Sequence, residues 1–192
     1  MALLCPVLAD HGRADLAYAL LHQDEYPSWG YSIRHGATTI WERWDGWTDH
    51  AGFQSPAMNS FNHYSLGSVG DWLFGRVAGI DQTAPSVAYR ELLLRPLPGG
   101  RLRWARAEQE TVRGRVACGW SVEEGRIAVT ATVPPGSVLD VCWSGVSHSG
   151  SDRSPGSATG PCRRVARFAA GGAGPAVPPR APLMEAPGLD QP

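Results

Sequence analysis

The spacing of apolar residues changes part-way along the chain, and this change limits the possible folds more than any other feature. In the first part, an apolar stripe recurs every three or four residues, which predicts a helix with one buried face. Its members are Leu66, Val69, Leu73, Val77 and Ile80. Between residues 125 and 133, GRIAVTATV instead places apolar residues at every second position, which predicts a half-buried strand. The chain is therefore expected to be α first and β afterwards.

Residues 1–85 are expected to be helices joined by loops. MALLCPVLAD at the start is apolar, but it is short, lacks basic residues and contains Pro6, so we expect a helix rather than a secretion signal. ADLAYALLHQ (14–23) is rich in helix formers, and Ser60 is a candidate N-cap for the striped helix. Three glycines inside that helix suggest close packing against a neighbour. They are Gly67, Gly70 and Gly75.

Residues 86–145 are expected to form an antiparallel β-sandwich. YRELLLRP and RLRWARAEQE read as strands, and VLDVCW (138–143) again alternates apolar and other residues. The turn signals EEG and PPG flank the strand at 125–133. Short alternating strands separated by turns are typical of a sandwich.

Residues 146–192 differ from both preceding parts. They contain eight prolines and seven glycines, and Phe168 is their one aromatic residue. A segment of this composition buries too little apolar surface to offset its ordering entropy, so it is expected to be disordered.

Composition narrows the classes of partner. The net charge of −1 does not suggest nucleic acid or anionic lipid, and no stretch is long enough to span a membrane. The four cysteines form no CxxC pair, and no metal or cofactor is predicted. Cys118 and Cys142 lie in strand-like runs and are expected to be buried apolar residues. A cytoplasmic location is expected by default.

The stretch GATTIWERWDGW (36–47) combines indoles with charges. It contains Trp41, Trp44 and Trp47, with Glu42 and Arg43 between the first two. Desolvation by indoles raises the pKa of a carboxyl group and a neighbouring guanidinium lowers it, a combination that can produce a general base. Glycoside hydrolysis uses such carboxylates, and tryptophans stack on sugar rings. The alternative is a structural, buried Glu42–Arg43 ion pair.

His63 and Trp29 each allow two interpretations. His63, in FNHY, lies near the start of the striped helix and is either part of a polar site or a hydrogen-bonded core histidine. Trp29, in a loop, is either a sugar platform or a packing residue.

Several segments resemble the end of the bacterial α-L-rhamnosidase catalytic domain and the β-sandwich that follows it. They are ADHGRADLAYALL, YPSWGYSI, GATTIWERWDGW, SFNHYSLGSVGDWLF and the long run from LLLRPLPGG to VPPGS. The resemblance covers residues 2–144. It implies an (α/α)6 barrel, inverting hydrolysis of terminal α-L-rhamnosides, Glu42 as general base and His63 as a rhamnose contact. It also implies that the neighbouring tryptophans, with Arg43, line the sugar pocket.

The chain also departs from this family. There the general acid and other pocket carboxylates lie upstream of the segments matched here, and Asp45 is the one carboxylate close to Glu42 in sequence. We therefore expect three parts: 1–85 from the end of the barrel, 86–145 from the sandwich, and the tail 146–192. Such a fragment would bind a rhamnose-containing glycoside but be inactive alone, and the upstream part of the barrel is its expected partner. The alternative is a non-catalytic carbohydrate-binding or partner-docking module.

Overall fold

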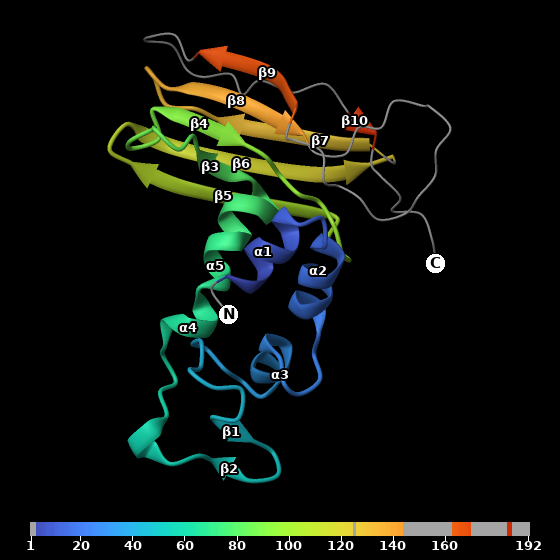
Figure 1. Cartoon of the computed structure of the whole chain (residues 1–192), viewed down its shortest axis with the longest axis vertical. Coiled ribbons are helices and arrows are strands. Elements are labelled where there is room, and N and C mark those ends of the chain that lie inside the picture. Colours follow the sequence, from blue (N-terminus) through green and yellow to red (C-terminus); the bar gives the residue numbers. More distant parts are fainter. Residues whose placement is uncertain (1–2, 125, 144–162, 170–183, 186–192) are drawn as a thin grey trace. The chain divides into compact units, whose positions relative to one another are not determined.

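The computed structural model describes residues 3–124, 126–143, 163–169 and 184–185. The chain forms two compact units (Figure 1). One contains residues 1–72 with 99–101, and the other contains residues 73–98 with 102–192. Within the described residues, no helix combines the length and apolar character needed to cross a membrane.

The first unit is built from short helices and long loops. Its elements are α1 (Leu4–Asp10), α2 (Ala14–His22), α3 (Trp29–Arg34), β1 (Trp47–Thr48), β2 (Gly52–Phe53), η1 (Pro56–Met58), α4 (Tyr64–Gly67) and α5 (Val69–Trp72). The helices expected at 1–10 and 14–23 are therefore present as α1 and α2. The loop from residue 35 to residue 63 carries the tryptophan-rich segment.

The core of the first unit lies where α1, α2 and α5 meet. Tyr18 of α2 is buried and contacts Trp72 edge to face, with ring centroids 5.2 Å apart. Cys5 and Ala9 of α1 and Ala17 of α2 are buried as well. Burial raises the pKa of the Tyr18 hydroxyl well above its usual range.

The single long helix expected from Ser60 to Ile80 is wrong. His63, not Ser60, caps α4, which ends at Gly67, and α5 follows as a separate turn. Residues Leu73–Ala78 then form the π-helix η2, and Ile80 begins a strand. Helical winding stops at Gly79, which has a φ of +96° and donates its N–H to the Phe74 carbonyl, 3.0 Å away. Glycine at this position ends helices because it has no Cβ to clash.

Close packing does not explain the glycines within this segment. A Cβ built on Gly67 or Gly75 would make only ordinary contacts, at 3.7 and 3.9 Å, and one on Gly70 would meet nothing within 4 Å. At Gly79, in contrast, it would lie 2.5 Å from the Pro96 nitrogen. The tightly packed glycine is thus the one at the helix end.

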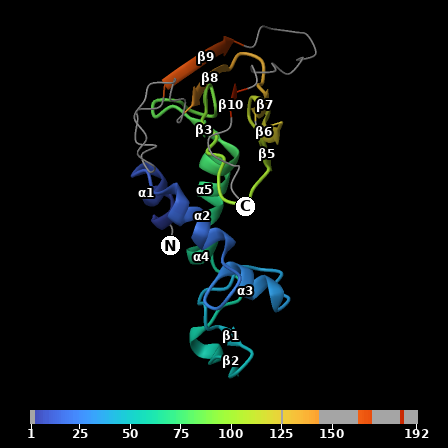
Figure 2. The ribbon, with the colours of Figure 1, turned by 90° about the vertical axis from the view of Figure 1, so that its right-hand side faces the viewer.

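The second unit is a β-sandwich of two four-stranded sheets, which Figure 2 separates into layers. The strands are β3 (Ile80–Gln82), β4 (Glu91–Leu94), β5 (Trp104–Thr111), β6 (Gly114–Glu123), β7 (Arg126–Thr132), β8 (Val138–Trp143), β9 (Arg163–Ala169) and β10 (Met184–Glu185). One sheet has the order β10-β7-β6-β5 and the other β3-β4-β8-β9. The expected sandwich is confirmed.

The sandwich core follows the alternation seen in the sequence. Ile127, Val129 and Ala131 of β7 are buried, as are Leu139 and Val141 of β8. Trp120 and Cys118 of β6 complete the same cluster. The Cys118 thiol donates to the Ala78 carbonyl at 3.0 Å, and burial raises its pKa to about 12. Cys142 is also buried, so both cysteines serve as small apolar residues, as expected.

One strand pair differs from the expected antiparallel pattern. β4 and β8 run parallel, with Leu92 opposite Leu139 and Leu94 opposite Val141. All other pairs in the two sheets are antiparallel. A parallel pair needs a long crossover, and here the connection contains β5, β6 and β7 of the opposite sheet.

The structure also differs from the disorder expected for residues 146–192. Within that range, β9 pairs with β8, and β10 pairs with β7. The RRVARFA segment of β9 contains neither glycine nor proline, and an average over 47 residues conceals such a stretch. The other residues of this range lie outside those that the structure describes.

Candidate functional site

Two loop segments of the first unit lie side by side and form the candidate site. The Glu42 N–H donates to the Ser60 carbonyl at 2.9 Å, and the His63 N–H donates to the Ile40 carbonyl at 2.9 Å. These bonds hold residues 40–42 against residues 60–63 as a short ladder. Glu42 and His63, 21 positions apart in sequence, are thereby brought together.

The Glu42 carboxylate is anchored by one of its oxygens. Oε2 accepts a hydrogen bond from the Ser60 N–H at 3.0 Å, so Ser60 both accepts from Glu42 and donates to it. Oε1 lies 3.8 Å from His63 Nε2. The Glu42 side chain is 35% exposed, so the carboxylate is fixed but still reached by solvent.

His63 is held by the helix that it caps. Its Nδ1 accepts a hydrogen bond from the Ser65 N–H at 3.1 Å, which satisfies one free donor at the start of α4. Its ring also stacks on Tyr64, with centroids 5.1 Å apart and planes inclined at 27°. At 33% exposure, His63 is not a core histidine.

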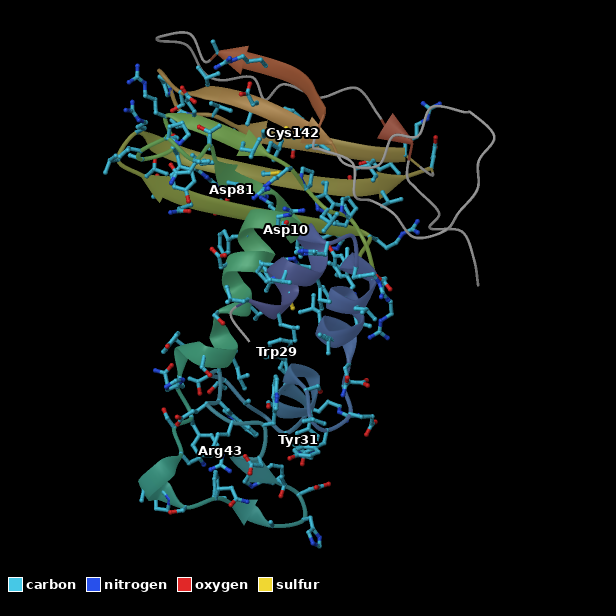
Figure 3. All side chains as sticks on the ribbon, viewed as in Figure 1. Asp10, Trp29, Tyr31, Arg43, Asp81 and Cys142 are labelled. Carbon is cyan, nitrogen blue, oxygen red and sulfur yellow. The ribbon has the colours of Figure 1, made fainter. Side chains whose placement is uncertain are left out.

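The alternative of a buried Glu42–Arg43 ion pair does not hold, because Arg43 pairs with Asp45. The Arg43 guanidinium binds Asp45 through two hydrogen bonds, Nε to Oδ1 at 2.9 Å and Nη2 to Oδ2 at 2.7 Å. The hydrogen bonds from Arg43 hold the pKa of Asp45 below its usual value, and those to Asp45 raise the pKa of Arg43. Figure 3 labels Arg43 in this loop region of the first unit.

The three predicted tryptophans occupy different environments. Trp41 is only 7% exposed and contacts Phe61 and Trp47 edge to face, at 5.3 and 6.5 Å between ring centroids. Trp47 is half-buried and also contacts the His35 ring, at 4.7 Å. Trp44 is half-buried as well. Trp41 is therefore a packed residue rather than an open platform.

Trp29, expected in a loop as either a sugar platform or a packing residue, begins α3 and belongs to this region. Its ring meets Trp44 edge to face, with centroids 5.1 Å apart, and its Nε1 donates to the Leu66 carbonyl at 3.2 Å. A mostly apolar pocket lies here. Its lining consists of Trp29, Ser32, Ile33, Ala37, Thr38, Thr39, Ile40, Trp41, Trp44 and Leu66. The pocket is thus bounded by three indoles, of which Trp41 is the chain neighbour of Glu42.

A buried tyrosine, Tyr31, is hydrogen-bonded to the loop that carries Glu42. Tyr31 of α3 donates its hydroxyl to Asp49 Oδ1 at 3.2 Å and accepts from the Asp49 N–H at 3.1 Å. Figure 3 labels Tyr31 and Trp29, which come from the same helix. The loop that carries Glu42 is therefore tied to α3.

Sequence comparisons place both units in one family. Residues 1–77 match the six-hairpin glycosidase domain of bacterial alpha-L-rhamnosidase, and residues 79–153 match the C-terminal domain of the same enzyme. An alpha-L-rhamnosidase of Streptomyces avermitilis is 48% identical over 146 residues, which is 76% of this chain and 14% of that protein. One from Formosa agariphila is 41% identical over 72% of this chain and 15% of its own length.

Solved structures agree with the sequence matches. The Streptomyces avermitilis alpha-L-rhamnosidase, complexed with L-rhamnose, aligns with a TM-score of 0.68 and 46% identity over 73% of this chain and 14% of that one. The Aspergillus terreus enzyme aligns with a TM-score of 0.68 and 34% identity, covering 73% of this chain and 16% of its own. The chain thus spans about one seventh of the length of these relatives. It belongs to the bacterial alpha-L-rhamnosidase family, and it corresponds to the C-terminal part, in which the six-hairpin glycosidase domain is followed by the C-terminal β domain.

Proposed function

We propose that Glu42 is the general base of an inverting alpha-L-rhamnosidase site that hydrolyses terminal α-L-rhamnosides. The observation that carries this proposal is the asymmetry of its carboxylate. Oε2 is held by the Ser60 N–H, whereas Oε1 lies 3.8 Å from His63 Nε2, in a side chain that is 35% exposed. A base needs such an arrangement, because one oxygen fixes its orientation and the other takes the proton from water.

The surroundings suit a sugar substrate. Trp29 and Trp44 supply half-buried indole surface to the pocket, and Trp41, which packs against Trp47, lines it as well. Indoles of this kind pack against the apolar face of a sugar ring. The similar Streptomyces avermitilis enzyme was solved with L-rhamnose, which supports rhamnose as the sugar here. His63 would donate a hydrogen bond to the sugar, and Arg43 would line the sugar pocket with the tryptophans.

The general acid is proposed to come from polypeptide outside these residues, namely the preceding part of the barrel. An inverting enzyme needs an acid about 6.5–9.5 Å from the base, with a raised pKa. Asp45 is unsuitable because Arg43 binds both of its oxygens and lowers its pKa. The 192-residue chain alone is therefore expected to be inactive on aryl α-L-rhamnosides.

A chimera tests this proposal. Residues 1–144 would replace the matching C-terminal segment of the Streptomyces avermitilis alpha-L-rhamnosidase, to which the chain is 48% identical. The chimera should hydrolyse an aryl α-L-rhamnoside and release the inverted sugar first, as followed by NMR. Glu42→Gln should lower kcat about 10²–10⁴-fold, which is the usual contribution of such a group, and leave rhamnose binding nearly unchanged.

Asp45→Asn is the matched control, because it also replaces a carboxylate by an amide in the same loop. It should retain most of the turnover. If Glu42→Gln kept most of its turnover, Glu42 would be a structural residue. Turnover by the 192-residue chain alone would show that the acid lies within it. Rhamnose binding without turnover in the chimera would favour a non-catalytic carbohydrate-binding module.

A further inference from the structure

The protons of the His63 ring can be assigned from its hydrogen bonds. A backbone N–H can only donate, so the bond from the Ser65 N–H at 3.1 Å requires a bare lone pair on Nδ1. A neutral imidazole carries one proton, which must then sit on Nε2. Nε2 is the nitrogen that faces Glu42, so His63 presents a hydrogen-bond donor to the carboxylate side.

The distance between His63 and Glu42 leaves room for one bridging oxygen atom. Nε2 and Oε1 are 3.8 Å apart, which is too long for a direct hydrogen bond. Two hydrogen bonds of about 2.8 Å that meet at roughly a right angle on one oxygen span this distance. Such an oxygen would receive the Nε2 hydrogen and donate its own proton to Oε1.

We infer that His63 and Glu42 together hold a single hydroxyl-type oxygen, that of a water molecule or of a sugar hydroxyl, and that the cap of α4 fixes the donor half of this pair. His63 is thus a positioning residue whose tautomer is set by the helix that it caps. The pairing of His63 with Glu42 through a shared oxygen is inferred from geometry alone. Only the role of this pairing in hydrolysis rests on the proposed function.

Two other histidines of the first unit provide internal controls, because their hydrogen bonds require the opposite tautomer. His11 Nδ1 lies 2.9 Å from the Val7 carbonyl, which can only accept, so Nδ1 must carry the proton. His22 Nε2 accepts from the Arg101 N–H at 3.1 Å, so its proton must also lie on Nδ1. His63 is therefore expected to carry its proton on Nε2, whereas His11 and His22 carry theirs on Nδ1.

The test is ¹⁵N NMR of the imidazole rings in the full 192-residue chain at about pH 8, above the usual histidine pKa of about 6.5. His63, assigned by the loss of its signals in His63→Asn, should show a protonated Nε2 and a bare Nδ1. His11 and His22 should show the reverse. A proton on Nδ1 of His63, or rapid exchange between the two tautomers, would overturn the assignment.

Coupling to Glu42 is tested in the same spectra. Glu42→Gln should shift the His63 Nε2–H signal and leave His11 and His22 unchanged, whereas the matched Asp45→Asn should shift none of them. A shift without added sugar identifies water as the shared oxygen, and one that needs added L-rhamnose identifies a sugar hydroxyl. If Glu42→Gln shifts the His63 signal in neither case, the shared oxygen is refuted. This outcome is independent of whether the chimera hydrolyses rhamnosides.

Discussion

Replacing Trp120 with phenylalanine should remove one hydrogen bond from the centre of the sandwich. Trp120 of β6 is only 3% exposed, and its Nε1 donates to the Val77 carbonyl at 2.7 Å. Val77 belongs to η2, so this bond joins the helical start of the second unit to its sheet. Phenylalanine keeps an aromatic ring at this position but cannot donate.

The expected cost has two contributions. The Val77 carbonyl is left buried without its indole partner, which costs about 1–3 kcal/mol. The smaller ring also buries less apolar surface, which costs roughly 1–2 kcal/mol. Together they lower the free energy of unfolding by about 2–5 kcal/mol.

Trp104→Phe is the matched control. Trp104 lies in the same unit, on β5, but is 68% exposed, so the same change should alter the free energy of unfolding by no more than about 0.5 kcal/mol. Urea titrations followed by far-UV circular dichroism would compare both variants with the natural chain, and separate transitions of the two units would be fitted separately. If Trp120→Phe cost no more than Trp104→Phe, the indole bond would contribute nothing.

Three further expectations concern glycine and histidine. Gly70→Ala should raise the thermal midpoint, by up to about 1 kcal/mol of added stability, because a Cβ there meets nothing within 4 Å; a lower midpoint would contradict this. Gly79→Ala should lower the midpoint, since the φ of Gly79 is +96° and the new Cβ would lie 2.5 Å from the Pro96 nitrogen. An unchanged midpoint would contradict the left-handed conformation of Gly79 and its close approach to Pro96. Burial, and then the charge of Arg101, lower the pKa of His22, so the unfolded chain takes up its proton first and stability should fall as pH drops below about 6.5. His22→Gln should make this fall shallower in urea titrations at several pH values, and an equal fall would assign it to other groups.

The order of elements was predictable because periodicity reports burial directly. The alternation at 125–133 marks β7, and Ile127 and Val129 are buried as the pattern required. The apolar stripe up to Ile80 led to the wrong prediction of one long helix. The spacing of apolar residues does not show where an α-helix changes to a π-helix or to a strand. Gly79 ends the helical part and Ile80 is buried from a strand, yet Ile80 still fits the spacing of three and four.

The sequence patterns singled out Glu42 and His63 as candidates, but they did not indicate how the two are brought together. Glu42 and His63 were both selected, yet the bond network between residues 40–42 and 60–63 that joins them is made by backbone atoms, which side-chain identities do not reveal. Arg43 was expected beside Glu42 because it is the next residue. The chain turns at residues 43–46, where the Gly46 N–H donates to the Arg43 carbonyl at 3.2 Å, and Arg43 reaches Asp45 within this turn instead.

The parallel pairing of β4 and β8 has a consequence for how the sandwich is made. β5, β6 and β7 connect through short turns and pair with their sequence neighbours, so this sheet can form early from local contacts. The pairing of Glu91 with Val138 must wait until all three have been synthesised and the long loop between them closes. Pulse-labelled hydrogen exchange during refolding should therefore protect the amides of β6 before those of β4. In the cell, β3 and β4 would leave the ribosome well before β8, and for that interval one edge of β4 has no strand beside it.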